Sequence, residues 1–142
     1  MAGLILKLRP YEEFLINGVV LQNGDRKTRL RVKTDGASVL RLRHAMRPEE
    51  ATTVERRAYY VAQMAVAGEI RPDEAAAILR NALDVLKADY TGRPEIEAVH
   101  RAGEELAAGR YYGVMRRLGE LVRPGNEPGG EDGGPLRQAR AV

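Results

Sequence analysis

Residues 16–33 read "INGVVLQNGDRKTRLRVK" and decide the fold of the first third of the chain. They hold two Asn-Gly pairs, at positions 17 and 23, and an Asp-Gly pair follows at position 35. Such pairs favour hairpin turns because both central residues tolerate positive φ. The sequence therefore predicts short strands separated by these turns, over residues 4–9, 13–16, 19–22, 28–33 and 37–42.

These strands are too short to bury a core by themselves. The segment between the two Asn-Gly pairs has four residues, and a strand rises roughly 3.3 Å per residue. Residues 1–47 are therefore expected to form a twisted β-meander or a small open barrel that needs a second layer to close it.

The second layer is predicted from residues 48–123, where the hydrophobic period changes from two to about 3.6. Thr52 with Glu55 fits a capping box for a helix over 53–67, and Gly68 is its natural stop. Further helices are predicted after Pro72, Pro94 and Gly109. The second helix is predicted to place on its core face Ala75, Ile78, Leu79, Ala82, Val85 and Leu86.

Together these patterns predict an α+β fold with three parts. A β sub-domain over 1–47 packs with an antiparallel helical bundle over 48–123. Residues 124–142 are rich in Gly, Pro and acid, and they cannot bury enough apolar area to offset their ordering entropy. We therefore expect this tail to be disordered.

The composition argues against several classes of function. The chain has no cysteine and no apolar run near the roughly 18 residues of a membrane span, so a cytoplasmic protein without membrane attachment is expected. The two histidines, His44 and His100, lie far apart in the sequence, so no metal site is predicted. Adjacent carboxylates such as Glu12-Glu13 point apart on a strand, and no nucleotide-binding or hydrolase motif is present. We expect no cofactor and no enzymatic activity.

Positive charge gathers in one segment of the chain. Positions 26–47 hold eight Lys or Arg residues and one acid, whereas residues 58–124 hold nine basic and ten acidic residues. In "TRLRVK" and "LRLR" basic and apolar residues alternate, so each strand places its basic side chains on one face. If the two strands pair across the Asp-Gly turn, both rows share a face whose like charges repel. Phosphates would neutralise such a face.

The predicted nucleic-acid contacts are Arg26, Lys27, Arg29, Arg31, Lys33, Arg41 and Arg43. A solvated face that protects a sheet edge is the alternative.

Two Tyr-Tyr pairs lie in the predicted helices. Adjacent helical residues point about 100° apart, so one ring of each pair can face the core while the other lies at its boundary. Core packing and partner binding both fit this arrangement. The candidate partner-binding residues are Tyr59, Tyr60, Tyr111 and Tyr112.

Several segments together resemble a known family. They are "FLINGVVLQNGDR" (14–26), "ASVLR" (37–41), "MRPEEATTVERRAYY" (46–60) and "AGRYYGVMRRLGELV" (108–122). In this order they resemble the FlbT family of flagellin expression regulators, over residues 3 to about 123. The Asn-Gly segment and the Met-x-Pro-x-Glu junction are the distinctive parts of the resemblance.

The resemblance implies a post-transcriptional regulator that is not an enzyme. Members of the family are associated with the 5′ untranslated region of flagellin mRNA, whose stability or translation they lower, or raise in some bacteria. They also work alongside the small helical protein FlaF. Two hypotheses follow: the basic sheet face binds flagellin leader RNA directly, or the helices bind FlaF or flagellin and the effect on mRNA is indirect. An exposed sheet edge also leaves pairing of two copies open.

Overall fold

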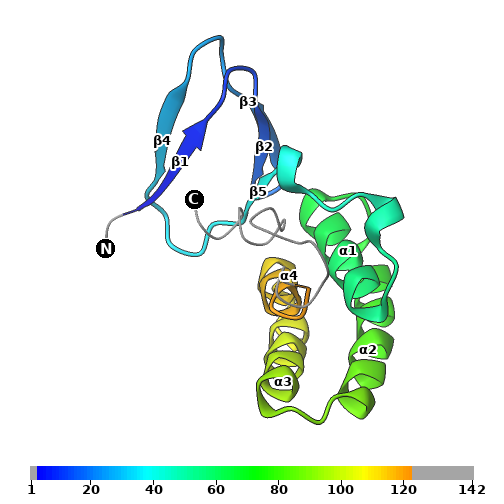
Figure 1. The fold of residues 1–142 in the computed structure, drawn as a ribbon. Coiled ribbons are helices and arrows are strands. Elements are labelled where there is room, and N and C mark those ends of the chain that lie inside the picture. The colour runs from blue at the N-terminus through cyan, green and yellow to red at the C-terminus, as the bar shows by residue number, and fades with distance from the viewer. Residues whose placement is uncertain (1–2, 123–142) are drawn as a thin grey trace.

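The computed structural model describes residues 3–122, in which five strands precede four α-helices (Figure 1). The strands are β1 (Leu4–Leu8), β2 (Glu13–Ile16), β3 (Val19–Gln22), β4 (Thr28–Val32) and β5 (Val39–Arg41). The helices are α1 (Val54–Ala67), α2 (Pro72–Asp89), α3 (Arg93–Ala107) and α4 (Tyr111–Gly119), with two short 3-10 helices at Leu42–His44 and Pro48–Glu50. The predicted α+β class is confirmed, and the predicted tail lies outside the described residues.

The first four strands form one long antiparallel ribbon with a bend in its middle. The Asn17-Gly18 turn joins β2 to β3, and both residues have positive φ, 50° and 82°. This is the hairpin that the first Asn-Gly pair predicts. Further along the ribbon β1 pairs with β4, also antiparallel. The two halves of the ribbon belong to different sheets.

The second Asn-Gly pair bends the ribbon instead of closing a hairpin. The side-chain amide of Asn23 donates to the backbone oxygens of Arg9 at 2.8 Å and Arg26 at 2.9 Å. Four residues separate β1 from β2 and five separate β3 from β4, so one arm of the bend carries one extra residue. The prediction of a hairpin at Asn23-Gly24 is wrong because the strands on either side of it pair with different partners.

The fifth strand completes a three-stranded sheet of order β3-β2-β5. It pairs with β2, with Leu40 opposite Leu15, and not with β4. The Asn17 side chain accepts a hydrogen bond from the Ser38 backbone N–H at 2.9 Å and so fixes the start of β5. The predicted pairing of β4 with β5 across the Asp35-Gly36 turn is therefore wrong.

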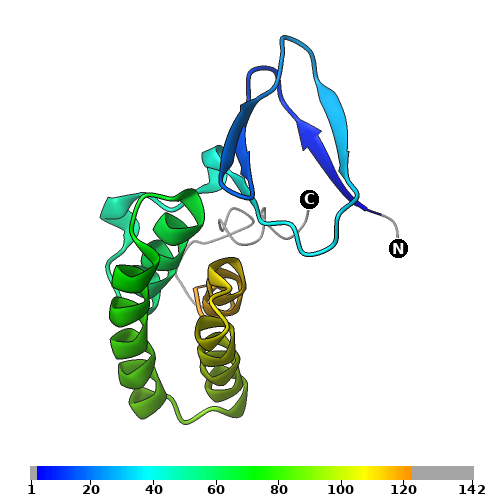
Figure 2. The same cartoon turned by 180° about the vertical axis from the view of Figure 1, so that it is seen from behind.

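This three-stranded sheet lies between the helices and the β1–β4 ribbon. On one face Leu15 and Leu40 join the core of the helical bundle. On the other face Phe14 and Val39 form a second, smaller core with Leu6 and Leu8 of β1. Figures 1 and 2 show the strands at one end of the molecule and the helices extending away from them.

The helices form a closed four-helix arrangement. Each packs against its neighbours in the chain, and α1 also packs against α4. Thr53 caps α1 by accepting from the Arg56 N–H at 3.1 Å. The capping box predicted at Thr52 and Glu55 is therefore wrong, because the N-cap lies one position later. Gly68 ends α1 with a φ of 77°, as predicted.

The buried face of α2 is narrower than the sequence predicts. It runs through Ala75, Leu79, Leu83 and Leu86, whereas Ile78 is 42% exposed and Val85 is 46% exposed. Among residues 3–122, no helix is long and apolar enough to cross a membrane.

The strand and helix halves are joined by a buried polar contact. The Gln63 side chain in α1 accepts from the Met46 N–H and donates to the Met46 carbonyl oxygen, both at 2.9 Å. Both residues are buried. The connecting segment after β5 is thereby fixed against the bundle, and with it the orientation of β5.

Candidate nucleic-acid interface

The outer face of the β1–β4 ribbon carries a row of basic side chains. Lys7 of β1 is the direct partner of Arg29 in β4, and Arg31 follows two residues later. Direct partners in an antiparallel pair point to the same face. These side chains are exposed, while Leu6 and Leu8, on either side of Lys7 in β1, are buried. Lys33, also exposed, follows directly after β4. We call Lys7, Arg29, Arg31 and Lys33 the basic face.

The cations of the basic face have no carboxylate within ion-pair distance in the described part of the chain. None of its four members takes part in an ion pair within residues 3–122. Directly opposed like charges on a sheet repel one another, and here the partner of Arg29 is another cation. The arrangement leaves several cations in water, where they are available to a polyanion.

Arg26 and Lys27 continue the positive charge into the bend of the ribbon. Both are exposed and lie just before β4. The carbonyl oxygen of Arg26 accepts hydrogen bonds from Asn23 and from the Thr28 hydroxyl. The backbone there is held in place by these hydrogen bonds, while the two long side chains are exposed to solvent. Five of the seven predicted nucleic-acid contacts thus lie on β4 or directly beside it.

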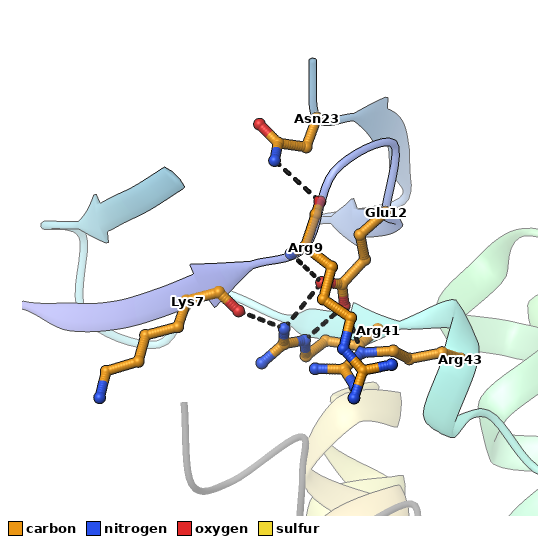
Figure 3. Close-up of polar contacts among 6 residues, drawn as sticks. All are labelled: Lys7, Arg9, Glu12, Asn23, Arg41 and Arg43. Atoms are coloured by element: carbon orange, nitrogen blue, oxygen red, sulfur yellow. Dashed lines mark hydrogen bonds and ion pairs between the residues drawn. The ribbon is translucent and has the colours of Figure 1, made fainter. Parts of the chain in front are cut away.

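The other two predicted contacts, Arg41 and Arg43, do not join this row. Arg41 is 3% exposed and points into the small core between the sheet and the ribbon. Its guanidinium donates to both carboxylate oxygens of Glu12, at 2.8 and 2.9 Å, and to the carbonyl oxygen of Lys7 at 2.5 Å (Figure 3). The predicted second basic row is wrong because β5 pairs with β2, which turns Arg41 inward.

Glu12 is the centre of this polar cluster, a role that no sequence pattern indicates. Its side chain is 2% exposed. Besides Arg41, it accepts from the Arg43 side chain at 2.8 Å and from the Arg9 backbone N–H at 2.9 Å. Figure 3 shows β1, β5 and the bend of the ribbon meeting at this carboxylate. The cluster therefore holds the two sheets together.

The electrostatics of the cluster favour a charged Glu12 and a neutral His44. Burial raises the pKa of Glu12, but hydrogen bonds from Arg41, Arg9 and Arg43 outweigh it and lower the pKa to about 2. Burial also lowers the pKa of His44 to about 4, and the positive charges of Arg43 and Arg41 add to this effect. Two guanidinium groups thus meet one carboxylate, and the surroundings of the cluster stay positive.

A shallow concavity beside the cluster contains an aromatic ring that is not among the predicted contacts. Tyr11 is 62% exposed and lines this concavity with Arg9, Gln22 and Arg43. Exposed aromatic rings beside arginines are the usual stacking platforms for unpaired bases. Phe14, the other aromatic residue of the strand region, is buried. The signal that could have identified Tyr11 is its position at the turn between β1 and β2.

The four candidate tyrosines have different environments. Tyr59 is fully buried in the helical core, and burial raises its pKa. Its predicted role in partner binding is therefore wrong. Tyr60 is half-buried and lines a groove between α1 and α2, as expected for the boundary ring of the pair. Tyr111 and Tyr112 are both half-buried, and the Tyr111 hydroxyl donates to the Pro72 carbonyl oxygen at 2.7 Å.

The two histidines stay apart in the structure. His44 lies at the end of the first 3-10 helix, and His100 pairs with Glu104 on α3 at 3.3 Å. Among the residues that the structure describes, no three metal-ligating side chains gather. The cations of the β1–β4 ribbon therefore remain the principal candidate site.

Fold and site together define a class: a small α+β protein whose bent β-ribbon carries an exposed basic face and packs, through a three-stranded sheet, on a four-helix bundle. The family model described as "Flagellar protein FlbT" matches residues 4–126. The chain therefore belongs to the FlbT family.

Three relatives illustrate the extent of the similarity. A protein of Caulobacter sp. (strain K31) is 49% identical over 61 residues, which are 43% of this chain and 46% of the relative. One from Rhizobium johnstonii is 28% identical over 115 residues, covering 81% of this chain and 76% of the relative. One from Brucella ovis is 29% identical over 113 residues, covering 80% and 73%. Each is named "Probable flagellum biosynthesis repressor protein FlbT".

The match spans about half the length of the Caulobacter relatives. It spans about three quarters of the Rhizobium and Brucella relatives. No solved structure matches the chain.

Proposed function

We propose that this chain regulates flagellum biosynthesis by binding the 5′ untranslated region of flagellin mRNA, whose stability or translation it alters. Two lines support the regulatory part: membership of the FlbT family and relatives named as flagellum biosynthesis repressors. The RNA-binding part is supported by one observation above all, the exposed row of Lys7, Arg29, Arg31 and Lys33 without an ion partner in residues 3–122.

The chemistry of this row suits a flexible single strand. Guanidinium groups bind phosphate through two parallel hydrogen bonds, and they also stack on bases. The basic face carries no aromatic ring, so contact with phosphates dominates its affinity. Tyr11, at the bend of the ribbon, supplies one ring on which an unpaired base can stack. Arg41 is not expected to take part in this contact, because it is buried and donates to Glu12 and Lys7.

The test is a titration of flagellin leader RNA with purified protein at several salt concentrations. For single strands, log K is expected to fall against log salt with a slope of about −0.7 for each phosphate contacted. The variant Arg29→Glu/Arg31→Glu/Lys33→Glu is expected to lose most of the affinity while its circular dichroism spectrum stays unchanged.

A matched control separates this face from net charge alone. Arg80, Lys87 and Arg101 are exposed on α2 and α3, far along the chain from the ribbon, and changing all three to Glu alters the net charge equally. This control is expected to bind RNA nearly as wild type does. Equal losses in the two triple variants would remove the basic face from the mechanism.

A second candidate function is that of an adaptor for FlaF or flagellin. It is favoured by an apolar groove of about 550 Å³ between α1 and α2, lined among others by Val54, Tyr60, Ile78 and Val85. Copurification with FlaF and with flagellin tests it, with Ile78→Lys as the variant. Loss of a partner in this variant, together with no measurable RNA binding at low salt, would favour the adaptor over the RNA-binding protein.

A further inference from the structure

The edge strand β3 exposes three consecutive apolar side chains. Val19 is 58% exposed, Val20 is 62% exposed and Leu21 is 38% exposed. Gln22 completes the strand, and it too is exposed. No other strand among residues 3–122 is exposed along its whole length with an apolar sequence.

The layers that cover the sheet stop at β2. Val20 lies opposite Leu15, on the face that meets the helices, and Leu21 lies opposite Phe14, on the face that meets the β1–β4 ribbon. Leu15 and Phe14 are each 3% exposed. On both faces of the sheet, a β2 side chain is therefore buried while its direct neighbour on β3 is exposed.

The run of apolar residues in β3 is typical of a strand that is buried on both faces. An uninterrupted apolar run is typical of strands with both faces covered, whereas a strand with one wet face alternates. β4 follows the second pattern, with Arg29 and Arg31 exposed to solvent. β3 follows the first pattern, yet within residues 3–122 nothing covers either face. The apolar sequence of β3 therefore predicts a covering layer or a further strand that residues 3–122 of a single chain do not supply.

The outer edge of β3 is open to backbone pairing. β3 pairs only with β2 in the described part of the chain. In a two-residue hairpin the residues flanking the turn exchange hydrogen bonds, so the N–H and C=O groups of Val20 and Gln22 point away from β2. Natural edge strands are usually protected by charge, proline or a bulge. β3 has none of these.

We propose that β3 pairs antiparallel with β3 of a second copy of this chain, so that two three-stranded sheets become one six-stranded sheet. A two-fold axis requires a surface that is complementary to itself. The β3 edge meets this requirement because it is uncharged along its length. The same pairing through β4 would bring Arg29 and Arg31 against their own copies. Each copy then supplies apolar side chains beside Val19, Val20 and Leu21 on both faces.

The interface is small, so the dimer is reversible. Four residues of edge bury much less than the roughly 800 Å² per partner of a standard stable interface. Sedimentation velocity across low to high micromolar protein, without RNA, is expected to show a monomer–dimer equilibrium. Sedimentation as a monomer throughout this range would overturn the proposal.

Charged substitutions locate the interface. Val20→Lys is expected to weaken dimerisation at least about tenfold, since it sets like charges near the two-fold axis. Ile78→Lys, at an exposed apolar position on α2, is the matched control and is expected to leave dimerisation unchanged. A larger effect of Ile78→Lys would place the interface on the helices and overturn the proposal.

Cross-linking tests the pairing without relying on a charge. The chain has no cysteine, so single substitutions report one site each. The two registers centred on the strand place either Val20 or Leu21 opposite itself, and one of Val20→Cys and Leu21→Cys is expected to form a disulfide-linked dimer on mild oxidation. Val85→Cys, also at an exposed position but on α2, is expected to form no disulfide-linked dimer. Failure of both β3 variants to cross-link, or equal cross-linking by Val85→Cys, would contradict the pairing.

Discussion

The β4 and β5 segments share a sequence pattern but have opposite roles. Arginine alternates with leucine or valine in β4 and in residues 40–43, where β5 supplies Leu40 and Arg41. In β4 the arginines face water and have no ion partner among residues 3–122. In β5, Arg41 is buried and donates to Glu12 and Lys7. The same side chain is therefore a candidate ligand contact in one strand and a structural group in the other.

The difference comes from the neighbouring strands. β4 pairs with β1 in a two-stranded ribbon, and the face of this ribbon that carries Lys7, Arg29 and Arg31 is exposed. β5 pairs with β2 in the part of the sheet that is covered on both faces, and there Glu12 neutralises the buried Arg41. An alternating basic strand thus acquires its role from its pairing partner, and substitutions can test each half of this comparison.

The largest effect is expected on removing the buried arginine. Breaking a buried ion pair by removing one partner costs about 3–5 kcal/mol, because the remaining charge is left uncompensated. Arg41→Ala is therefore expected to lower the free energy of unfolding by about 3 kcal/mol, since Arg43 still pairs with Glu12. Urea unfolding measures it, and the double variant Glu12→Leu/Arg41→Leu is expected to recover much of the loss. A cost no larger than that of Arg31→Ala would contradict the structural role of Arg41.

Acid is expected to weaken the fold in two steps. In the folded protein His44 keeps a pKa of about 4, below its ordinary 6.5, so stability present above pH 6.5 is lost as the pH falls toward 4. Glu12 has a pKa of about 2, below its ordinary 4.5, so stability present above pH 4.5 is lost as the pH falls toward 2. The second step amounts to about 3 kcal/mol.

Unfolding by urea at a series of pH values measures both steps. Glu12→Gln is expected to be less stable at neutral pH and to lack the lower step, whereas His44→Gln is expected to lack the upper one. A lower step of the same size in Glu12→Gln as in wild type would assign it to other carboxylates.

Much of the fold was predictable from the sequence, but strand pairing was not. All five strands and all four helices lie close to their predicted positions, because period and turn residues are local signals. Of three Gly-containing turn pairs, however, only Asn17-Gly18 closes a hairpin. The Asn23-Gly24 pair lies in a bend, and the Asp35-Gly36 pair lies in a longer connection between β4 and β5. No local sequence feature distinguishes these two pairs from one that closes a hairpin.

The candidate site was predictable to the same extent. The β4 row follows from alternation, and the structure adds Lys7 as its cross-strand partner. The burial of Arg41 was not predictable, because it depends on a carboxylate 29 positions earlier in the chain. No local sequence pattern marks Glu12 as a buried residue. Acidic residues are almost never fully buried unless they are paired, and its partner Arg41 lies far along the chain.

A smaller effect is expected from the turn that sets the register of the ribbon. Gly18 has a φ of 82°, and a residue with a β-carbon is destabilised by roughly 1 kcal/mol in this conformation. Gly18→Ala is therefore expected to lower the free energy of unfolding by about 1 kcal/mol. Gly24→Ala, at the bend where the backbone φ is not positive and space is open, is the control and is expected to cost less. Equal costs would mean that the Asn17-Gly18 turn does not set the register.

The smallest effect on stability is expected in β4. Arg29→Ala and Arg31→Ala remove exposed side chains without ion partners in the described residues, and such changes usually stay within about 0.5 kcal/mol. Each is nevertheless expected to make RNA binding less sensitive to salt, with a slope shallower by about 0.7 for each phosphate that the missing guanidinium would have bound. An unchanged slope in both variants would show that β4 is only a solvated edge.

The opposite roles of the two strands can be measured most directly by following the arginine side-chain Nε–H signals in NMR spectra during titration with flagellin leader RNA. The Arg29 and Arg31 signals are expected to shift as RNA is added and to return as salt is raised. The Arg41 signal is expected to stay in place, because Glu12 already accepts from its Nε–H at 2.8 Å. Unmoved Arg29 and Arg31 signals at low salt, with RNA bound, would contradict the assignment of the β4 face as the RNA contact.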